Sequence, residues 1–221
     1  MILASVRQMI VDRGYHAVTI RELAEVCRVS VPTLYNQFGG KDQLLAAAIE
    51  DHFQSAYDSQ DFQRAKPGLD RLLTLIDQSS HQLLESSTYH QRLISAFSSL
   101  GSTHDVQMRV ATAFAQVIVA QLDVMQGKRQ LVDWVDPAQL AGQMVTACIG
   151  TAVQWSAGFI DSQSLQSSMR YAMGLVLLGT LRGQSLERIS SMVQAAQATL
   201  PAVPELAINL NSLNSHEHGA R

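Results

Sequence analysis

The stretch that decides the fold is TIRELAEVCRVSVPTLYNQFGGK, which runs from Thr19 to Lys41. Thr19, followed three residues later by Glu22, matches a capping box, in which each side chain binds the other residue's backbone N–H at the start of a helix. Apolar residues then recur at helical spacing and predict one buried face. They are Ile20, Leu23, Ala24 and Cys27. The pattern predicts a short amphipathic helix.

A second short helix follows after a tight turn in which Val29 is expected to be buried. Ser30 is a suitable N-cap, and Pro32 falls in the first turn, where a missing N–H is harmless. Leu34 and Phe38 lie four residues apart and are expected to face inward together. The expected outward positions are Val31, Pro32, Thr33, Asn36 and Gln37, with Tyr35 at the edge. Small, hydroxyl and amide side chains on a compact helix suit the DNA major groove, so we interpret the stretch as a helix-turn-helix with Ser30–Phe38 as recognition helix.

Other interpretations of these residues stay open at this point. The outward side chains of the second helix could form an ordinary solvated face, and Tyr35 could be mainly a packing residue. Arg21 could reach a DNA phosphate or pair with Glu25, four residues later on the same helix.

The composition of the 221-residue chain favours a core-rich helical protein, because 47% of its residues are apolar and only 16% are charged. We expect no membrane span, since no uninterrupted apolar run reaches about 18–20 residues. The N-terminus lacks a basic-then-apolar secretory pattern, so a cytoplasmic location is expected. Cys27 and Cys148 are far apart in apolar helical surroundings and are expected to be reduced.

The net charge of −3 does not favour nucleic acid as a partner. Its distribution along the chain is uneven, since the first 50 residues hold five basic and five acidic groups and the other 171 hold 11 and 14. The N-terminal end is therefore the less acidic one without being a strongly basic patch. A few cations at the right places would suffice for one docked unit.

The rest of the chain also has helical periodicity, and the expected fold class is all-α with about nine or ten helices. We expect residues 1–45 to form a three-helix unit with the helix-turn-helix, residues 46–204 a larger helical domain and residues 205–221 an irregular tail. The expected helices lie at 2–13, 19–27, 30–38, 41–57, 69–86, 88–100, 103–125, 136–159, 162–181 and 185–200. Gly14 is a strong signal for the end of the first helix. Asp136-Pro137 is a strong signal for the start of a later helix, and Ser162 or Ser164 is expected to cap the next one.

Several spaced motifs in the first 55 residues resemble the N-terminal domain of TetR-type one-component transcriptional repressors. They are Gly14-Tyr15, Thr19-Ile20-Arg21-Glu22-Leu23-Ala24, Val29-Ser30, Thr33-Leu34-Tyr35 and Phe38-Gly39-Gly40-Lys41-Asp42. The resemblance implies an Ω-shaped homodimer in which two helix-turn-helix units bind half-sites of double-stranded operator DNA. It also implies a C-terminal domain that dimerises and encloses a small-molecule effector.

The resemblance gives roles to individual residues. Thr33 and Tyr35 look like hydroxyls that touch phosphate or a base edge, and Thr19 and Lys41 match positions near the DNA backbone. The base-reading candidates are Val31, Pro32, Asn36 and Gln37, and Arg21 is a phosphate candidate.

The chain departs from the family at two positions. Arg28 stands where glycine is usual, so a left-handed turn would cost about 1 kcal/mol, unless the turn is altered; Arg28 could also add a phosphate contact. Arg7 stands where the family often keeps an apolar residue, which indicates a shifted first helix or a snorkelling side chain.

The helices at 136–159 and 162–181 are the most apolar late segments, and the first contains small residues that permit close approach of another helix. Those residues are Gly142, Ala147, Gly150, Ala157 and Gly158. By the resemblance, these two helices would form a four-helix dimer interface. They could instead be core helices of a monomer.

The effector site is less visible in the sequence. Candidate lining residues are Phe97, Met108, Phe114, Cys148 and Trp155, each of which could also be plain core. Their character favours a lipophilic, uncharged effector of unknown identity. We expect no cofactor and no metal, since His216 and His218 in the tail are too few for a metal site.

We expect no enzyme, because the sequence has no phosphate loop, metal-ligand spacing or nucleophile elbow. The favoured function is a repressor that binds a palindromic operator as a dimer and is released by its effector. One alternative is a helical interaction or ligand-binding protein that has lost specific DNA binding. Another is a helical enzyme with an inherited N-terminal module.

Overall fold

The computed structural model describes residues 2–14, 17–57, 59–98 and 104–201, and these residues form eleven helices and no strand. The helices are α1 (Ile2–Arg13), α2 (Ile20–Cys27), α3 (Val31–Phe38), α4 (Lys41–Tyr57), α5 (Gln60–Arg64), α6 (Leu69–Glu85), α7 (Ser87–Ser98), α8 (His104–Gly127), α9 (Pro137–Ser156), α10 (Leu165–Leu178) and α11 (Gly183–Thr199). The all-α class is confirmed. The expected irregular tail, 205–221, lies outside the described residues.

The helix count exceeds the expected nine or ten because of α5, a five-residue helix that the sequence did not indicate. It begins after Ser59, whose hydroxyl accepts a hydrogen bond from the N–H of Phe62 at 3.2 Å. The Phe62 side chain is buried in the main core, and this contact supports a helix too short to be stable by itself.

The end of α10 and the start of α11 also differ from expectation. α10 ends at Leu178 and not near Leu181, because Leu181 forms an isolated antiparallel bridge with Leu131. Gly183, expected after the end of one helix, is the first residue of α11. At the other end of α10, Ser164 makes no side-chain capping bond; the Asp161 carboxylate accepts from the Ser164 N–H at 2.7 Å.

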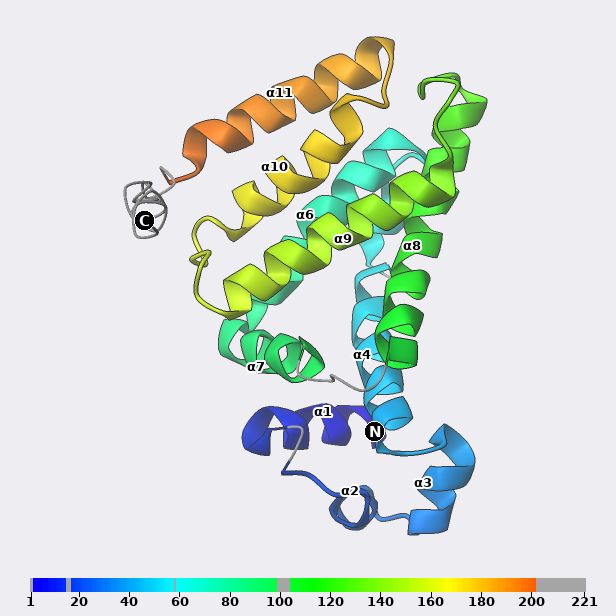
Figure 1. Ribbon diagram of the computed structural model, residues 1–221, viewed down its shortest axis with the longest axis vertical. Coiled ribbons are helices and arrows are strands. Elements are labelled where there is room, and N and C mark those ends of the chain that lie inside the picture. The colour runs from blue at the N-terminus through cyan, green and yellow to red at the C-terminus, as the bar shows by residue number, and fades with distance from the viewer. Residues whose placement is uncertain (1, 15–16, 58, 99–103, 202–221) are drawn as a thin grey trace, which may run out of the picture.

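The helices are arranged as a small N-terminal unit at one end and a larger bundle above it (Figure 1). α1, α2 and α3 (blue) form the lower end, and α9, α10 and α11 lie in the upper part. α4 and α8 contact each other between these two parts. α4 therefore connects the helix-turn-helix to the bundle.

Two apolar clusters form the core. The larger cluster contains residues of α5, α6, α8, α9, α10 and α11, and Ile94 of α7. The smaller one lies in the N-terminal unit around Val6, Leu23 and Leu34, and it also contains Leu93 of α7 and Val110 of α8. The N-terminal unit thus shares its core with two helices of the bundle.

One helix of the described residues, α8, is long and apolar enough over Met108–Gly127 to cross a membrane by length and composition, with mean hydropathy 1.3. The window is interrupted by Gln116, Gln121 and Asp123, so it is not an uninterrupted apolar run of that length. Ile118, Leu122 and Met125 of this helix are fully buried in the main cluster. These three side chains pack in the main core, although only 28% of the window is buried.

Gly174 of α10 packs closely against α11. A Cβ added there would collide with Val193 and lie 2.9 Å from Met192 Cε, so Gly174→Ala should lower the free energy of unfolding by about 1–3 kcal/mol. Denaturant unfolding measures the change. Gly179→Ala, at the residue directly after α10, is the matched control, since a Cβ there has no atom within 4 Å; equal stability of the two variants would contradict the packing described.

Candidate nucleic-acid interface

The start of α2 is held by the capping box that the sequence predicts. The Glu22 N–H donates to Thr19 Oγ1 at 3.3 Å, and the Thr19 N–H donates to Glu22 Oε2 at 2.8 Å. Arg13 of α1 adds an ion pair to Glu22 Oε1 at 2.8 Å. These hydrogen bonds, first the one from the Thr19 backbone, then that from its hydroxyl and then that from Arg13, lower the pKa of Glu22 from 4.5 to about 2. The carboxylate is therefore charged at neutral pH.

The turn after α2 is closed by Arg28 in the left-handed conformation, with φ 56° and ψ 40°. Its N–H bonds to the Glu25 carbonyl at 3.1 Å, and the Val29 N–H bonds to the Ala24 carbonyl at 3.0 Å. This pair of bonds is the Schellman arrangement that usually has glycine at the position of Arg28. The turn is therefore unaltered; the non-glycine residue takes the left-handed conformation at about 1 kcal/mol, and its side chain is exposed.

The second helix of the motif, α3, begins at a cap formed by Ser30. Ser30 Oγ accepts from the Thr33 N–H at 3.2 Å and lies 2.7 Å from Thr33 Oγ1. Leu34 is fully buried and Phe38 is half-buried, so this side of α3 faces the small cluster. The helix ends at Gly39, which has a φ of 91°.

The opposite side of α3 is open to solvent. Its exposed residues are Pro32, Thr33, Tyr35, Asn36 and Gln37, while Val31 is half-buried. Tyr35 is 50% exposed, and a Cβ at Gly40 would lie 4.0 Å from its Cε1, so its ring covers Gly40 while half of the side chain remains accessible. The structure thus places hydroxyl, amide and apolar groups together on one accessible helix face.

The three residues expected to contact the DNA backbone lie outside α3, near the starts of α2 and α4. Arg21 is exposed, and within the described part of the chain no ion pair joins it to Glu25. Thr19 is exposed, and its hydroxyl donates to Glu22 at 2.9 Å. Lys41 is half-buried at the first turn of α4; burial lowers its pKa, and the nearby Glu22 carboxylate acts in the opposite direction.

The five expected effector residues do not all line one space. Trp155 is fully buried in the main cluster, and its Nε1–H donates to Ser162 Oγ at 3.2 Å. Cys148 is buried in the same cluster, and burial raises the pKa of its thiol to about 12. Phe114 packs against that cluster and Met108 is 50% exposed. The side chain of Phe97, on α7, lies outside the described residues.

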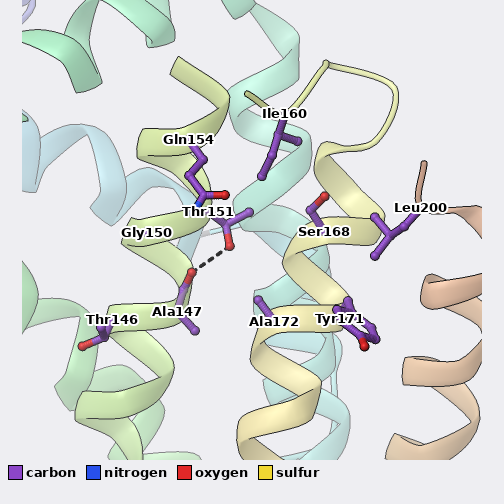
Figure 2. A pocket seen from close by; sticks show the side chains of 10 residues that line it. All are labelled: Thr146, Ala147, Gly150, Thr151, Gln154, Ile160, Ser168, Tyr171, Ala172 and Leu200. Carbon is purple, nitrogen blue, oxygen red and sulfur yellow. Dashed lines mark hydrogen bonds between the residues drawn. The ribbon is translucent and has the colours of Figure 1, made fainter. Parts of the chain in front are cut away.

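A groove of about 380 Å³ lies between α9 and α10 and was not found from the sequence (Figure 2). Its walls are Thr146, Ala147, Gly150, Thr151, Gln154, Ile160, Ser168, Tyr171, Ala172 and Leu200. Thr151 Oγ1 donates to the Ala147 carbonyl within α9 at 2.8 Å. The sequence contains one feature that could have indicated this groove. Small and polar residues recur every four positions at Gly142, Thr146 and Gly150, and this spacing places them on one side of α9, which they leave uncovered.

These two short helices are joined by a tight turn, and the second has one buried and one accessible face. They form a helix-turn-helix unit of the kind that docks in the DNA major groove. Residues 2–48 match the sequence profile described as "Bacterial regulatory proteins, tetR family". Residues 2–48 thus carry an N-terminal domain of the tetR type of bacterial regulatory proteins.

A curated relative, the HTH-type transcriptional activator FasR of Mycolicibacterium smegmatis, is 39% identical over 51 residues. That match covers 23% of this chain and only 23% of the activator.

Two solved structures share the fold over most of the chain. SmeT, the repressor of the Stenotrophomonas maltophilia multidrug efflux pump SmeDEF, aligns with TM-score 0.58 and 15% identity over 83% of this chain and 90% of its own. FadR from Bacillus subtilis, in complex with stearoyl-CoA, aligns with TM-score 0.60 and 15% identity over 78% of this chain and 96% of the FadR chain.

The capping box predicts a pH dependence. Because the pKa of Glu22 falls on folding from 4.5 to about 2, the stability from its charged form is present above pH 4.5 and is lost as pH falls toward 2. Glu22→Gln keeps a capping side chain that does not titrate, so the difference in thermal midpoint between wild type and variant should shrink over this range. Thermal unfolding followed by circular dichroism measures it; a constant difference would contradict the assigned cap.

Proposed function

We propose that the protein is a ligand-responsive transcriptional repressor that binds a palindromic operator as a homodimer in the cytoplasm and is released by a small lipophilic effector. The observation that carries the proposal is the face of α3. Its polar side chains are exposed while Leu34, on the same helix, is fully buried, and this helix lies within the residues that match the family. An accessible, firmly packed helix is what major-groove binding needs.

The side chains of this face suit direct readout of bases. The amides of Asn36 and Gln37 can pair bidentately with adenine, and Val31 and Pro32 can contact thymine methyl groups. Thr33 is the less available hydroxyl, because it lies 2.7 Å from Ser30 Oγ; we assign it to a phosphate or base edge close to the start of α3.

Phosphate contacts are assigned to Thr19, Arg21, Tyr35 and Lys41. Arg28 is a further candidate, since it is exposed in the turn just before α3. The formal neutrality of the first 50 residues does not oppose this assignment. Arg13 is paired with Glu22 and Arg7 with Asp51, so the exposed Arg21 and Arg28 are the arginines that can meet DNA.

We assign the dimer interface to helices 136–159 and 162–181, which the structure resolves as α9 and α10. Leu175 of α10 is 45% exposed, and a Cβ at Gly142 or Gly150 of α9 would meet no atom within 4 Å. A second copy packed on this side would bury Leu175 and fill the groove between the two helices (Figure 2). A two-fold dimer also matches a palindromic operator.

The effector is assigned to the domain of residues 46–204, with Phe97, Met108, Phe114, Cys148 and Trp155 as candidate contacts. The stearoyl-CoA complex of the structurally similar FadR supports a lipophilic ligand for this fold. Both regulatory directions occur among similar proteins, since FasR is an activator and SmeT a repressor. We propose repression because SmeT aligns with most of the chain, whereas FasR matches only 51 residues.

The proposed mechanism is an allosteric switch through α4. In the dimer without effector, the recognition helices lie one DNA turn apart, about 34–36 Å. Effector binding in the larger domain moves α4 and breaks this register. A coupling free energy of about 1–3 kcal/mol would give useful induction.

Selection from a randomised duplex pool, at two salt concentrations, tests DNA binding. We expect enrichment of a palindromic site, and Tyr35→Ala or Lys41→Ala should weaken binding to it by about 1–3 kcal/mol while the dimer persists. Gln194→Ala, at an exposed position of α11, is the control and should bind as wild type. No enrichment at low salt would favour the alternative of a helical binder without specific DNA recognition; unchanged affinity of both variants would remove the assigned DNA face.

Replacement of Leu175 tests the dimer. Leu175→Glu places a charge on the proposed interface and should raise the dimer dissociation constant at least about tenfold, equivalent to about 1.4 kcal/mol. Sedimentation velocity over a concentration series measures it. Val26→Glu changes an apolar residue of similar exposure, 51%, on α2 and should leave the dissociation constant unchanged. A monomer–dimer equilibrium insensitive to both changes would place the interface elsewhere.

A further inference from the structure

The long helix α8 contributes to both apolar cores. Val110, near its start, is buried in the N-terminal cluster, whereas Ile118 and Leu122, about two and three turns later, are fully buried in the main cluster. Its 24 residues span about 36 Å, and in Figure 1 it runs beside α4 and on to the upper part of the bundle. A closely packed helix moves as one body, so α8 relates positions in one cluster to positions in the other.

An ion pair joins the start of α8 to α4. Arg109 Nη2 donates to Glu50 Oε2 at 3.1 Å, with 53% of the arginine side chain and 27% of the glutamate side chain exposed. Arg109 directly precedes Val110, so an ionic contact and a packing contact with the N-terminal part are adjacent on α8. Neighbouring residues of a helix point about 100° apart, so the two contacts together oppose rotation of α8 about its own axis.

The next residue of α4 continues this connection to α1. Asp51 Oδ2 accepts from Arg7 Nη1 at 2.8 Å, and the Ala48 carbonyl accepts from the same nitrogen at 2.6 Å. The Arg7 side chain is only 13% exposed, and α1 has the expected bounds, so this arginine does not shift the first helix. Glu50 and Asp51 thus bind α8 on one side of α4 and α1 on another.

The other half of α8 packs on α9, one of the two helices to which the dimer interface is assigned. Met125 of α8 and Met144 of α9 are both fully buried in the main cluster. α8 therefore connects the assigned dimer interface to the helix that leads into the helix-turn-helix.

We propose that Arg109 is a positioning residue that sets the separation and direction of the two recognition helices, and so the spacing of operator half-sites that the dimer accepts. A two-fold dimer fixes α9 relative to the symmetry axis, and α8 relates that axis to α4 through Glu50. Exposed ion pairs contribute little to stability, so this pair acts on the direction of α4 and not on folding. The statement about half-site spacing rests on the proposed function; the link between α8 and α4 does not.

Arg182 provides a matched comparison. It pairs with Asp133 at 2.9 Å and is 46% exposed, close to the 53% of Arg109. Both residues of this pair lie in connections between helices of the bundle, outside α4 and α8. A change at Arg182 therefore removes an exposed arginine contact without touching the proposed link.

Hydrogen exchange on the full-length protein, read by mass spectrometry, tests the link without DNA. Arg109→Glu places a like charge against Glu50 and should speed exchange of backbone amides in α4 and at the start of α8 about fivefold or more. The double variant Arg109→Glu/Glu50→Arg restores opposite charges and should return these rates to within about twofold of wild type. Arg182→Glu should leave α4 unchanged.

Wild-type exchange of α4 in Arg109→Glu, or accelerated exchange that the double variant does not reverse, would overturn the proposal. Arg109→Met removes the charge and keeps an apolar stem, and it replaces Arg109→Glu as the single variant if the latter does not fold.

The second measurement uses the operator obtained by selection, together with copies that have one base pair inserted or removed between the half-sites. One base pair turns a half-site by about 34–36° and shifts it by about 3.4 Å, so the wild type should bind either copy at least about tenfold more weakly. Arg109→Glu should reduce this discrimination to about threefold or less, and the double variant should restore it.

Full discrimination in Arg109→Glu, or an equal loss of affinity at all three spacings, would overturn the assignment of half-site spacing to Arg109. If selection yields no operator, the proposed function fails, while the exchange measurement still decides whether Arg109 joins α8 to α4.

Discussion

The burial of Leu34 is the constraint on which the candidate interface depends. α3 has eight residues, and a helix of this length is not stable alone in water. Its orientation comes from Leu34, which is fully buried against the N-terminal cluster, and from caps at Ser30 and Gly39. With one side fixed in this way, the side chains from Pro32 to Gln37 that face away from the cluster must be exposed. The interface is thus a consequence of packing on the other side of the helix.

That packing is shared between the two parts of the molecule. Leu93 of α7 and Val110 of α8 complete the cluster that holds α3, and Arg109 of α8 pairs with Glu50 of α4 at 3.1 Å. The helix-turn-helix therefore does not have a core of its own that is independent of the bundle. A regulator needs such a connection, because a change in the bundle can alter the DNA-binding unit only through contacts that both share.

Much of the local structure follows from local sequence. Thr19 and Glu22 form the predicted capping box, α1 has the predicted bounds, and Asp136 caps α9 by accepting from the Ala138 N–H at 2.7 Å. These features depend on residues within one turn of each other. Predictions failed where distant segments meet: α10 ends early because Leu181 pairs with Leu131, fifty positions away, and α5 depends on the burial of Phe62 in the main core.

The sequence by itself determined the helix-turn-helix, its capping and the residues on the outward face of α3, because all of these depend on spacing within short segments. The left-handed conformation of Arg28 is also local, because the Schellman bonds that require it lie within the turn. Only the tertiary structure decided what Arg7 does, because Arg7 is held by acceptors more than forty positions away. The groove between α9 and α10 was likewise decided by the tertiary structure, because its walls come from two helices and from Leu200, which follows a third helix. A linear pattern specifies which face of a helix is apolar, but the partner that covers that face is selected by the packing of the whole chain.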